Sequence, residues 1–326
     1  MNRHVEEISN ILRDNDNFLI LSHLEPDGDA LGSSLAIRQF LADQWGKNVC
    51  MPSPVNWPGR YSFLKKHYNG NKMANPDETD CILFLDSSSP DRIDWGTLNP
   101  EDFGSVPKVV IDHHEEGIPF GDVNWIDKES AAVGEMVYTL ITELEAVVTP
   151  EIAECLYLAI LTDTGRFTYS NTSSNSLRIS AELIETGNID PSEIASHVYF
   201  NYSEEYLRNI GIALYNSRTY RDAKIVLLTL DKASVRSFST TFDETEGIVD
   251  LAMSVRGVEL AALFKEISTN VNRVSMRSRG LVDIGALAKE LGGGGHFNAA
   301  GCTLRMPLSL AREVILDRFE RYLGNS

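Results

Sequence analysis

The first two-thirds of the chain alternates short apolar runs with longer amphipathic stretches. The runs FLILSH, CILFLD and VVIDHH predict buried strands, and apolar residues at helical spacing predict the helices between and after them. The predicted strands cover residues 18–23, 81–86 and 109–114, with a weaker one over 48–52, and the predicted helices cover 4–14, 30–43, 130–146, 151–161, 174–187 and 203–220. Strands that alternate with helices indicate an α/β fold with a parallel sheet and crossover helices.

The pattern changes near residue 223. Strands are predicted over 224–230, 258–267, 272–279 and 301–306, and helices over 243–254, 283–291 and 308–323. This order is typical of a smaller α/β domain with its own mixed sheet. A length of 326 residues also favours two domains. We therefore expect a catalytic domain over residues 1–200, a helical linker over 201–222 and a second domain over 223–326.

Charge is distributed unevenly along the chain. Residues 1–222 hold 16 Lys and Arg against 35 Asp and Glu, a net of −19, whereas residues 223–326 hold 13 against 12, a net of +1. An acidic chain is a poor candidate for binding long duplex nucleic acid, because that affinity comes mostly from neutralised phosphates. A short phosphorylated ligand remains compatible with this charge, since bound cations reverse the sign of an acidic site.

Composition also predicts the compartment. The chain has no apolar run near the roughly 20 residues that a membrane helix needs, and its N-terminus lacks an apolar signal core. The four cysteines are far apart and form no CxxC pair, which is typical of free thiols in a reducing cytoplasm. We expect a cytoplasmic protein without a membrane partner.

Candidate chemistry gathers where the predicted strands end. His23, Asp27 and Asp29 follow the first strand in SHLEPDGDALGSS, although Pro26 to Asp29 is also strong turn chemistry. Asp86 ends the next strand, where a helix N-cap is the simpler interpretation. In parallel sheets ligands bind outside the carboxyl ends of the strands.

The third strand ends in Asp112-His113-His114, and a predicted helix ends in Asp163-Thr164-Gly165, where a cap is again an alternative. If the strand continues through both histidines, they point to opposite faces and only one of them can face a site.

Taken together, two histidines and several carboxylates favour a mixed nitrogen and oxygen site over unrelated turns and caps. Such ligands suit manganese or magnesium better than a closed thiolate zinc site. So many carboxylates in one place would repel one another without cations. Two divalent ions fit this number of ligands, with one carboxylate bridging them.

The segments HLEPDGD, Asp86, DHH and DTG resemble the four motifs of the DHH phosphoesterases, and GGGGHFNAAGC resembles the signature of their DHH-associated C-terminal domain. The length and arrangement are most similar to bacterial nano-RNase/pAp phosphatases. The resemblance implies a two-metal enzyme that degrades very short oligoribonucleotides and removes the 3′-phosphate of 3′-phosphoadenosine 5′-phosphate (pAp). Manganese is the favoured metal, with magnesium as the alternative.

The resemblance also implies a role for each motif residue. The implied metal ligands are His23 and Asp27 for one ion, Asp29, His113 and Asp163 for the other, and Asp86 as the bridge between them. His114 would face the substrate phosphate as an electrostatic stabiliser or proton donor. Asp112 would orient the histidines, so that His114, Asp86 and Asp112 make up the catalytic set.

Phosphate-binding candidates lie in the second domain. The glycines before His296 are a flexible loop or a backbone cradle for a phosphate, and the resemblance favours the cradle. Strand alternation places Arg273, Ser275, Arg277 and Arg279 on one face, which is a solvated face or a phosphate site. The implied substrate-binding residues are Arg277, Ser278, Gly293, Gly294, Gly295 and His296, with Arg256 and Arg166 as weaker candidates.

The expected reaction is hydrolysis of a phosphoester in a cleft between the two domains, with short oligoribonucleotides or small phosphorylated nucleotides as substrates. The alternatives are a linear or cyclic dinucleotide such as pApA or cyclic-di-AMP, short polyphosphate, a nucleotide-binding sensor without catalysis, and a structural protein stapled by metal. The sequence leaves open the oligomeric state, including a homodimer. It also leaves open the roles of Glu25 and Arg166, which depart from the common motif wording.

Overall fold

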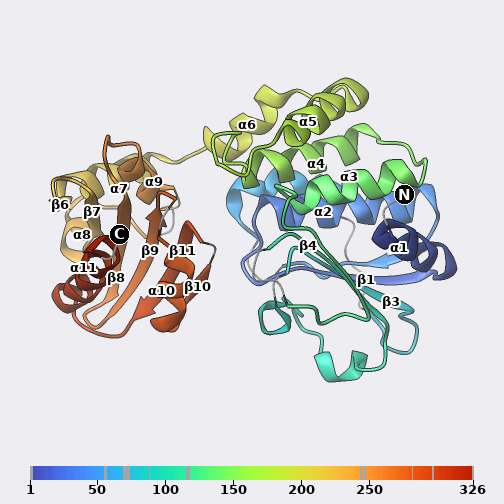
Figure 1. The fold of residues 1–326 in the computed structure, drawn as a ribbon, viewed down its shortest axis with the longest axis horizontal. Coiled ribbons are helices and arrows are strands. Elements are labelled where there is room, and N and C mark those ends of the chain that lie inside the picture. Colours follow the sequence, from blue (N-terminus) through green and yellow to red (C-terminus); the bar gives the residue numbers. More distant parts are fainter. Residues whose placement is uncertain are drawn as a thin grey trace. The chain divides into compact units, whose positions relative to one another are not determined.

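The structure is a computed structural model that describes residues 3–54, 57–68, 74–87, 89–114, 118–242, 245, 247–280, 282–295 and 297–324. The chain divides into two compact units, Met1–Asn201 and Tyr202–Ser326, which are described separately here (Figure 1). The first is built on a parallel sheet and the second on a mixed sheet, so the predicted α/β class is confirmed. Within the described residues, no helix is long and apolar enough to cross a membrane.

The first unit contains a five-stranded sheet in which every neighbouring pair is parallel. In spatial order the strands are β2 (Asn48–Cys50), β1 (Asn17–Leu21), β3 (Cys81–Leu85), β4 (Lys108–Asp112) and β5 (Val123–Ile126). The sequence pattern misses β5, because a strand of four residues is too short to establish a period.

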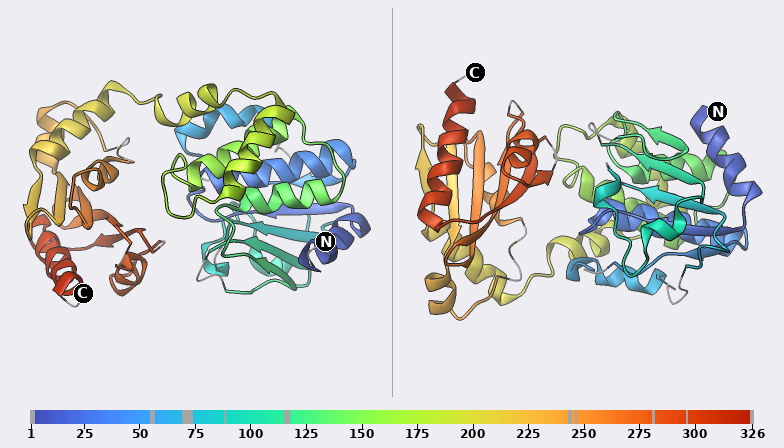
Figure 2. Two further views of the ribbon diagram at one scale, coloured as in Figure 1. Left: turned by 45° about the horizontal axis from the view of Figure 1, so that its top comes forward. Right: turned by 90° about the horizontal axis from the view of Figure 1, so that it is seen from below.

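Two apolar layers cover the two faces of this sheet. Phe18 and Ile20 of β1 belong to the core under the long helices, whereas Leu19 and Leu21 belong to a separate core that includes Phe103 from a short helical turn. Successive strand residues point to opposite faces, so both faces must be apolar, and the strands are continuous apolar runs. Figure 1 and Figure 2 show the long helices on one side of the sheet.

The helices that cover this sheet follow the sequence pattern closely in the middle of the chain. The α-helices of the first unit are α1 (Arg3–Asp14), α2 (Gly28–Gln39), α3 (Val133–Glu143), α4 (Pro150–Asp163), α5 (Ser174–Gly187) and α6 (Pro191–Tyr199). A π turn, η1 (Phe40–Gln44), continues α2, and the 3₁₀ segments are η2 (Gly59–His67), η3 (Pro90–Arg92) and η4 (Pro100–Phe103). All twelve residues of α2 are buried, and its side chains are small or apolar except for Asp29, Arg38 and Gln39.

The second unit contains a six-stranded sheet in the order β10-β11-β9-β8-β7-β6, parallel only between β7 and β8. Its strands are β6 (Arg218–Tyr220), β7 (Ile225–Leu230), β8 (Leu260–Ser268), β9 (Val271–Ser278), β10 (Gly294–Gly295) and β11 (Ala299–Leu304). Its helices are α7 (Glu204–Tyr215), α8 (Lys232–Ser237), α9 (Ile248–Met253), α10 (Ile284–Glu290) and α11 (Leu308–Gly324). Part of the predicted helix over 243–254 lies outside the described residues.

The helix predicted over 203–220 is shorter than expected. It ends at Tyr215, and the chain then forms the edge strand β6, which pairs with β7. Tyr206 and Ile212 of α7 pack with Leu228 of β7 in one of this unit's cores. Sheet pairing therefore overrides helical spacing in the last residues of this stretch.

Candidate metal centre

The candidate ligands come together because of the strand order. β1, β3 and β4 are neighbours in a parallel sheet, so their carboxyl ends lie side by side at one edge. His23 follows β1, Asp86 follows β3, and His113 follows β4. Since β3 lies between the other two strands, Asp86 is placed to contact ligands from both sides.

Both histidines of the DHH segment face the same carboxylate, and the expectation that only one could do so is wrong. β4 ends at Asp112, so strand alternation does not extend to the histidines. His113 Nε2 lies 3.6 Å and His114 Nδ1 lies 3.5 Å from Oδ1 of Asp86. On the β1 side, His23 Nε2 lies 3.5 Å from the other oxygen of Asp86.

Three groups of side chains bring metal-ligand atoms within 4.8 Å of one another. They are His23 with Asp27 and Asp86, Asp29 with His113 and Asp163, and Asp86 with His113 and His114. The first two groups coincide with the two sets of ligands assigned from the sequence, and Asp86 and His113 each take part in two groups. The third group places His114 near the same position as His113.

Two of these acids also accept hydrogen bonds from backbone amides at the start of a helix. The turn and cap interpretations are therefore compatible with a role as metal ligands. Asp27 is the N-cap of α2 and accepts hydrogen bonds from the backbone N–H groups of Asp29 and Ala30. Asp29 accepts from Val133 N at 2.6 Å and from Gly134 N at 2.9 Å, at the start of α3. Residue types along the chain do not reveal these donors, because nearly every residue has a backbone amide.

The histidines are oriented by hydrogen bonds on the ring nitrogen that faces away from the carboxylates. His23 Nδ1 is 2.7 Å from the carbonyl oxygen of Leu24, and His113 Nδ1 is 3.1 Å from that of Ser130. A carbonyl oxygen can only accept, so each Nδ1 donates, and a neutral ring then has its lone pair on Nε2. Fixing the tautomer in this way is typical of metal-binding histidines.

His114 differs from the other two histidines. Its Nδ1 donates to Oδ1 of Asp112 at 2.7 Å, and Asp112 is fully buried with its Oδ2 lacking a hydrogen-bond partner within the described part of the chain. Because the hydrogen bond from His114 is the one that this buried carboxylate accepts, Asp112 positions the His114 ring and stabilises its positive charge.

The centre has strongly perturbed proton affinities. Burial and the neighbouring Asp86 carboxylate raise the pKa of Asp29, and burial and the neighbouring Asp27 raise the pKa of Asp163. Burial acts to raise the pKa of Asp86 too, but the adjacent histidines outweigh it and lower that pKa. Burial lowers the pKa of His23, yet the hydrogen bond and charge of Asp86 prevail and raise the pKa to about 9.

The donor set fits divalent cations. Asp29, Asp86 and Asp163 are neighbours, and among the described residues none of them forms an ion pair with a lysine or arginine. Without cations, the repulsion between these carboxylates is reduced by protonated histidines and by raised carboxylate pKa values. Hard cations bound by carboxylate and imidazole would supply the missing positive charge.

Asp86 also has an unusual backbone conformation. Its φ of 54° lies in the left-handed region, which costs an aspartate of order 1 kcal/mol or more. In this conformation the Asp86 carboxylate lies within 3.6 Å of nitrogens of His23, His113 and His114. Strain of this kind persists where the surrounding structure compensates for it.

The residues assigned to substrate binding lie in the second unit and are partly engaged already. Arg277 Nε donates to Asp250 Oδ1 at 2.7 Å, and its side chain stays partly exposed. Ser278 is buried, and its hydroxyl lies 2.7 Å from the carbonyl oxygen of Val282 and 2.9 Å from Oδ1 of Asn298. Arg273 and Ser275 share the accessible face of β9 with Arg277, as alternation predicted.

The glycine run forms a short strand rather than an open loop. The amides of Gly292 and Gly293 donate to carbonyls of α10, and Gly294 and Gly295 pair with β11. A Cβ on Gly293 would lie 2.1 Å from the carbonyl oxygen of Gly301, so the close approach requires glycine, while Gly294 has open space beside it. His296 lies outside the described residues.

The remaining arginine candidates are Arg279, predicted on the face of β9, and the weaker candidates Arg166 and Arg256. Arg279 lies beyond the end of β9 and donates to the carbonyl oxygen of Met253. Arg166 has a left-handed backbone and stacks over the ring of Tyr199 at 4.8 Å. Arg256 is exposed. Arg279 and Arg166 therefore make local structural contacts, whereas Arg256 is exposed and Arg277 is partly exposed and paired with Asp250.

Comparison with known families matches both units. Residues 17–160 match the DHH family, N-terminal domain, and residues 223–325 match the DHHA1 domain.

Known relatives match nearly the whole chain. The chain is 31% identical over 303 residues to the bifunctional oligoribonuclease and PAP phosphatase NrnA of Thermus thermophilus, covering 91% of this chain and 87% of that protein. It is 29% identical to the protein of the same name from Bacillus subtilis, covering 89% and 90%. Among solved structures, an exopolyphosphatase-related protein from Bacteroides fragilis superposes with a TM-score of 0.87 at 29% identity, covering 99% and 97%.

Proposed function

The chain belongs to the DHH family and carries a DHHA1 domain, and from this premise we propose that it is a phosphoesterase acting on short oligoribonucleotides and on pAp. DHH phosphoesterases depend on divalent metal ions. The observation that carries the proposal is the presence of two ligand groups, one containing Asp86 and the other containing His113, whose ring lies 3.6 Å from Asp86, at the carboxyl ends of β1, β3 and β4. The similarity to oligoribonuclease and PAP phosphatase relatives over about nine-tenths of the chain supports the choice of substrate.

Six residues would hold two ions. His23 and Asp27 would bind one, Asp29, His113 and Asp163 would bind the other, and Asp86 would bridge them. Divalent ions in such a site supply a nucleophile at neutral pH and neutralise phosphoryl charge. Manganese suits this mixture of carboxylate and imidazole ligands, with magnesium as the alternative.

His114 is assigned to the substrate phosphate. Burial lowers the pKa of its ring, but the hydrogen bond to Asp112 and the charges of Asp86 and Asp112 together outweigh burial and raise the pKa. The protonated form of the ring, which these acids favour, can stabilise the crowded negative charge of a phosphoryl transition state or donate a proton to the leaving oxygen. Asp112 would hold the ring in that orientation.

The second unit would hold the rest of the nucleotide. Arg277 is a partly exposed cation on the β9 face. On substrate binding it would release its ion pair with Asp250 and pair with a substrate phosphate instead. Ser278 would position Asn298, to which its hydroxyl is hydrogen-bonded. The backbone from Gly293 to Gly295 would let a ligand approach closely. His296 keeps its assignment as a phosphate contact by family resemblance alone.

A comparison of substrates tests the proposal. The purified protein with manganese would be given a labelled RNA dinucleotide, a 24-mer, pAp, cyclic-di-AMP and short-chain polyphosphate, and initial rates would be measured. Polyphosphate is included because one solved relative is described as exopolyphosphatase-related. Faster turnover of the dinucleotide and pAp than of the other substrates is the expected result. Dominant hydrolysis of cyclic-di-AMP or polyphosphate would be consistent with the metal chemistry but would contradict the proposed substrates.

Matched variants separate catalysis at this centre from a contaminating nuclease. Asp86→Asn removes the shared ligand while keeping the shape of the side chain. Asp91→Asn makes the same chemical change at an exposed residue of η3 that belongs to none of the ligand groups. Activity that is lost in the first variant and kept in the second belongs to this chain, and equal activity in both would refute the assignment.

A further inference from the structure

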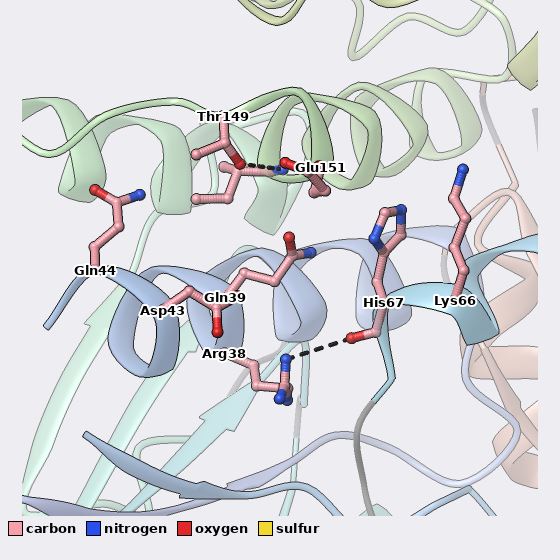
Figure 3. Close-up of a pocket in the computed structure, with 9 residues that line it drawn as sticks. Arg38, Gln39, Asp43, Gln44, Lys66, His67, Thr149 and Glu151 are labelled. Carbon is pink, nitrogen blue, oxygen red and sulfur yellow. Dashed lines mark hydrogen bonds between the residues drawn. The ribbon is translucent and has the colours of Figure 1, made fainter. Parts of the chain in front are cut away.

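The first unit contains a second polar cavity that none of the centre's ligands lines. Its volume is about 360 Å³, near the lower limit for small-molecule sites. Arg38 and Gln39 come from α2, Lys66 and His67 from η2, and Thr149 and Glu151 from the start of α4 (Figure 3). Three segments far apart in the sequence therefore contribute polar side chains to one partly open cavity.

Arg38 is the unusual member of this cavity. The residue is only 7% exposed, yet its guanidinium makes a single, long hydrogen bond of 3.4 Å to the carbonyl oxygen of His67. Within the described part of the chain, no carboxylate forms an ion pair with it. A buried arginine has five N–H donors and is almost always paired with an anion, because a desolvated charge is costly.

Lys66 and His67, which also line the cavity, share one carboxylate partner. Lys66 Nζ and His67 Nε2 both contact Glu154, at 2.9 and 2.5 Å. Asp43 lies at the cavity and is exposed, but it forms no ion pair with Arg38 within the described residues. Glu151, the other acid that lines the cavity, is likewise not paired with Arg38 among those residues, so Arg38 is the lining cation without a paired carboxylate.

The cavity lies at the opposite end of two helices from the metal centre. Arg38 comes eleven residues after Asp27 on α2, and Ile152, which also lines the cavity, comes eleven residues before Asp163 on α4. At 1.5 Å per residue the separation is about 16 Å, too far for one small ligand to reach both sites. The two helices are in backbone contact between these ends, since a Cβ on Gly32 would lie 2.3 Å from the carbonyl oxygen of Cys155.

We propose that this cavity is an effector site for a small oxyanion, a phosphate or a carboxylate, bound by Arg38. The anion's oxygens would pair with the unused N–H groups in the planar geometry that guanidinium favours. Helices α2 and α4 connect the site to the centre, because α2 carries Asp27 and Asp29 and α4 ends in Asp163. A ligand that shifts the start of α4 against α2 also shifts ligand atoms at the centre.

Binding is tested by calorimetric titration of the full chain with inorganic phosphate and, separately, with succinate, against sodium chloride of equal ionic strength. The two anions distinguish a phosphoryl from a carboxyl ligand. We expect one site in the wild-type protein, at least tenfold weaker in Arg38→Met, and retained in Asp86→Asn, which disrupts the metal centre. The matched control Asp43→Asn removes a neighbouring carboxylate and should bind the anion at least as tightly as the wild type.

A second variant covers the case in which Arg38→Met fails to fold. Ile152→Phe adds volume to the cavity wall without changing charge and should also weaken binding. Anion binding that is unchanged in a folded Arg38→Met or Ile152→Phe variant, lost only in Asp86→Asn, or undetectable at millimolar concentration would overturn the site.

The effector role has its own measurement and rests on the proposed function. The bound anion should change the rate of dinucleotide hydrolysis at least twofold in the wild type and leave Arg38→Met unchanged. If the dinucleotide is not a substrate, manganese affinity with and without the anion replaces the rate. Binding of the anion without either change would show that the cavity holds a ligand but does not act on the centre.

Discussion

Asp86 contacts His23 on one side and His113 and His114 on the other, so both predicted metal positions depend on it. We expect Asp86→Asn to lower kcat/KM by at least about 10²–10³-fold, as for loss of a major electrostatic group in an active site. Manganese stoichiometry, measured by calorimetry, should fall with it. An unchanged stoichiometry would mean that Asp86 does not bridge two ions.

His113 and His114 are adjacent, and the structure allows either to reach a metal at Asp86. We predict that His114→Gln lowers kcat by about 10²–10⁴-fold, the range for general acid–base groups, while manganese affinity is retained. His113→Gln should lose manganese affinity as well. Loss of manganese affinity in His114→Gln would instead identify His114 as a ligand.

Protonation of the histidines makes metal binding depend on pH. The pKa of His23 is raised to about 9, so the metal-free ring holds a proton at neutral pH, and a metal must displace it. Manganese affinity should therefore increase as pH rises from 6 towards 9, by about tenfold per pH unit for each displaced proton. Titrations in two buffers with different ionisation enthalpies would measure the protons released, and zero release would contradict the prediction.

Helices α2 and α4 pack closely enough that glycine is required between them. Gly32→Ala would place a Cβ against the backbone of Cys155, and we expect it to destabilise the protein by about 1–3 kcal/mol, as overpacking does. Gly211→Ala on α7 is the matched control, since nothing lies within 4 Å of that position. It should stabilise by about 0.4–1 kcal/mol through the unfolded chain.

Urea unfolding of both glycine variants tests this packing. Since Gly32 and Gly211 belong to different units, each transition would be assigned by its own probe before the shifts are compared. Equal effects of the two substitutions would mean that the α2–α4 contact tolerates an extra methyl group.

The two units should respond differently to metal, because every ligand group found among the described residues lies in the first one. A metal at a concentration of 100 Kd stabilises the folded state by about 2.7 kcal/mol. We predict that manganese slows amide hydrogen exchange around the strand ends of the first unit and leaves the β7–β9 core unchanged. Chelation should reverse the effect without unfolding the second unit. Unfolding of the whole chain on chelation would support a structural metal.

Patterns between near neighbours in the chain predict most of the helices and strands, because burial on one or both faces imposes a repeat of 3.6 or 2 residues. The α/β class, the mixed second sheet and the motif residues could all be read from the sequence. Elements without a full repeat, such as β5, were missed. The end of the helix at Tyr215 was misplaced, because pairing between β6 and β7 is a contact that helical spacing does not contain.

The candidate centre, too, was predictable from the sequence in part and depends on the tertiary structure for the rest. Residue types at the strand ends predict a mixed carboxylate and imidazole site, since that chemistry is local to each motif. The central place of Asp86 follows from β3 lying between β1 and β4, and the pairing of Asp29 with the start of α3 joins residues more than a hundred positions apart. That Arg38 has no carboxylate partner among the described residues leaves no trace in the sequence either. Whether a charge is neutralised depends on side chains brought near it by folding, and no local pattern records them.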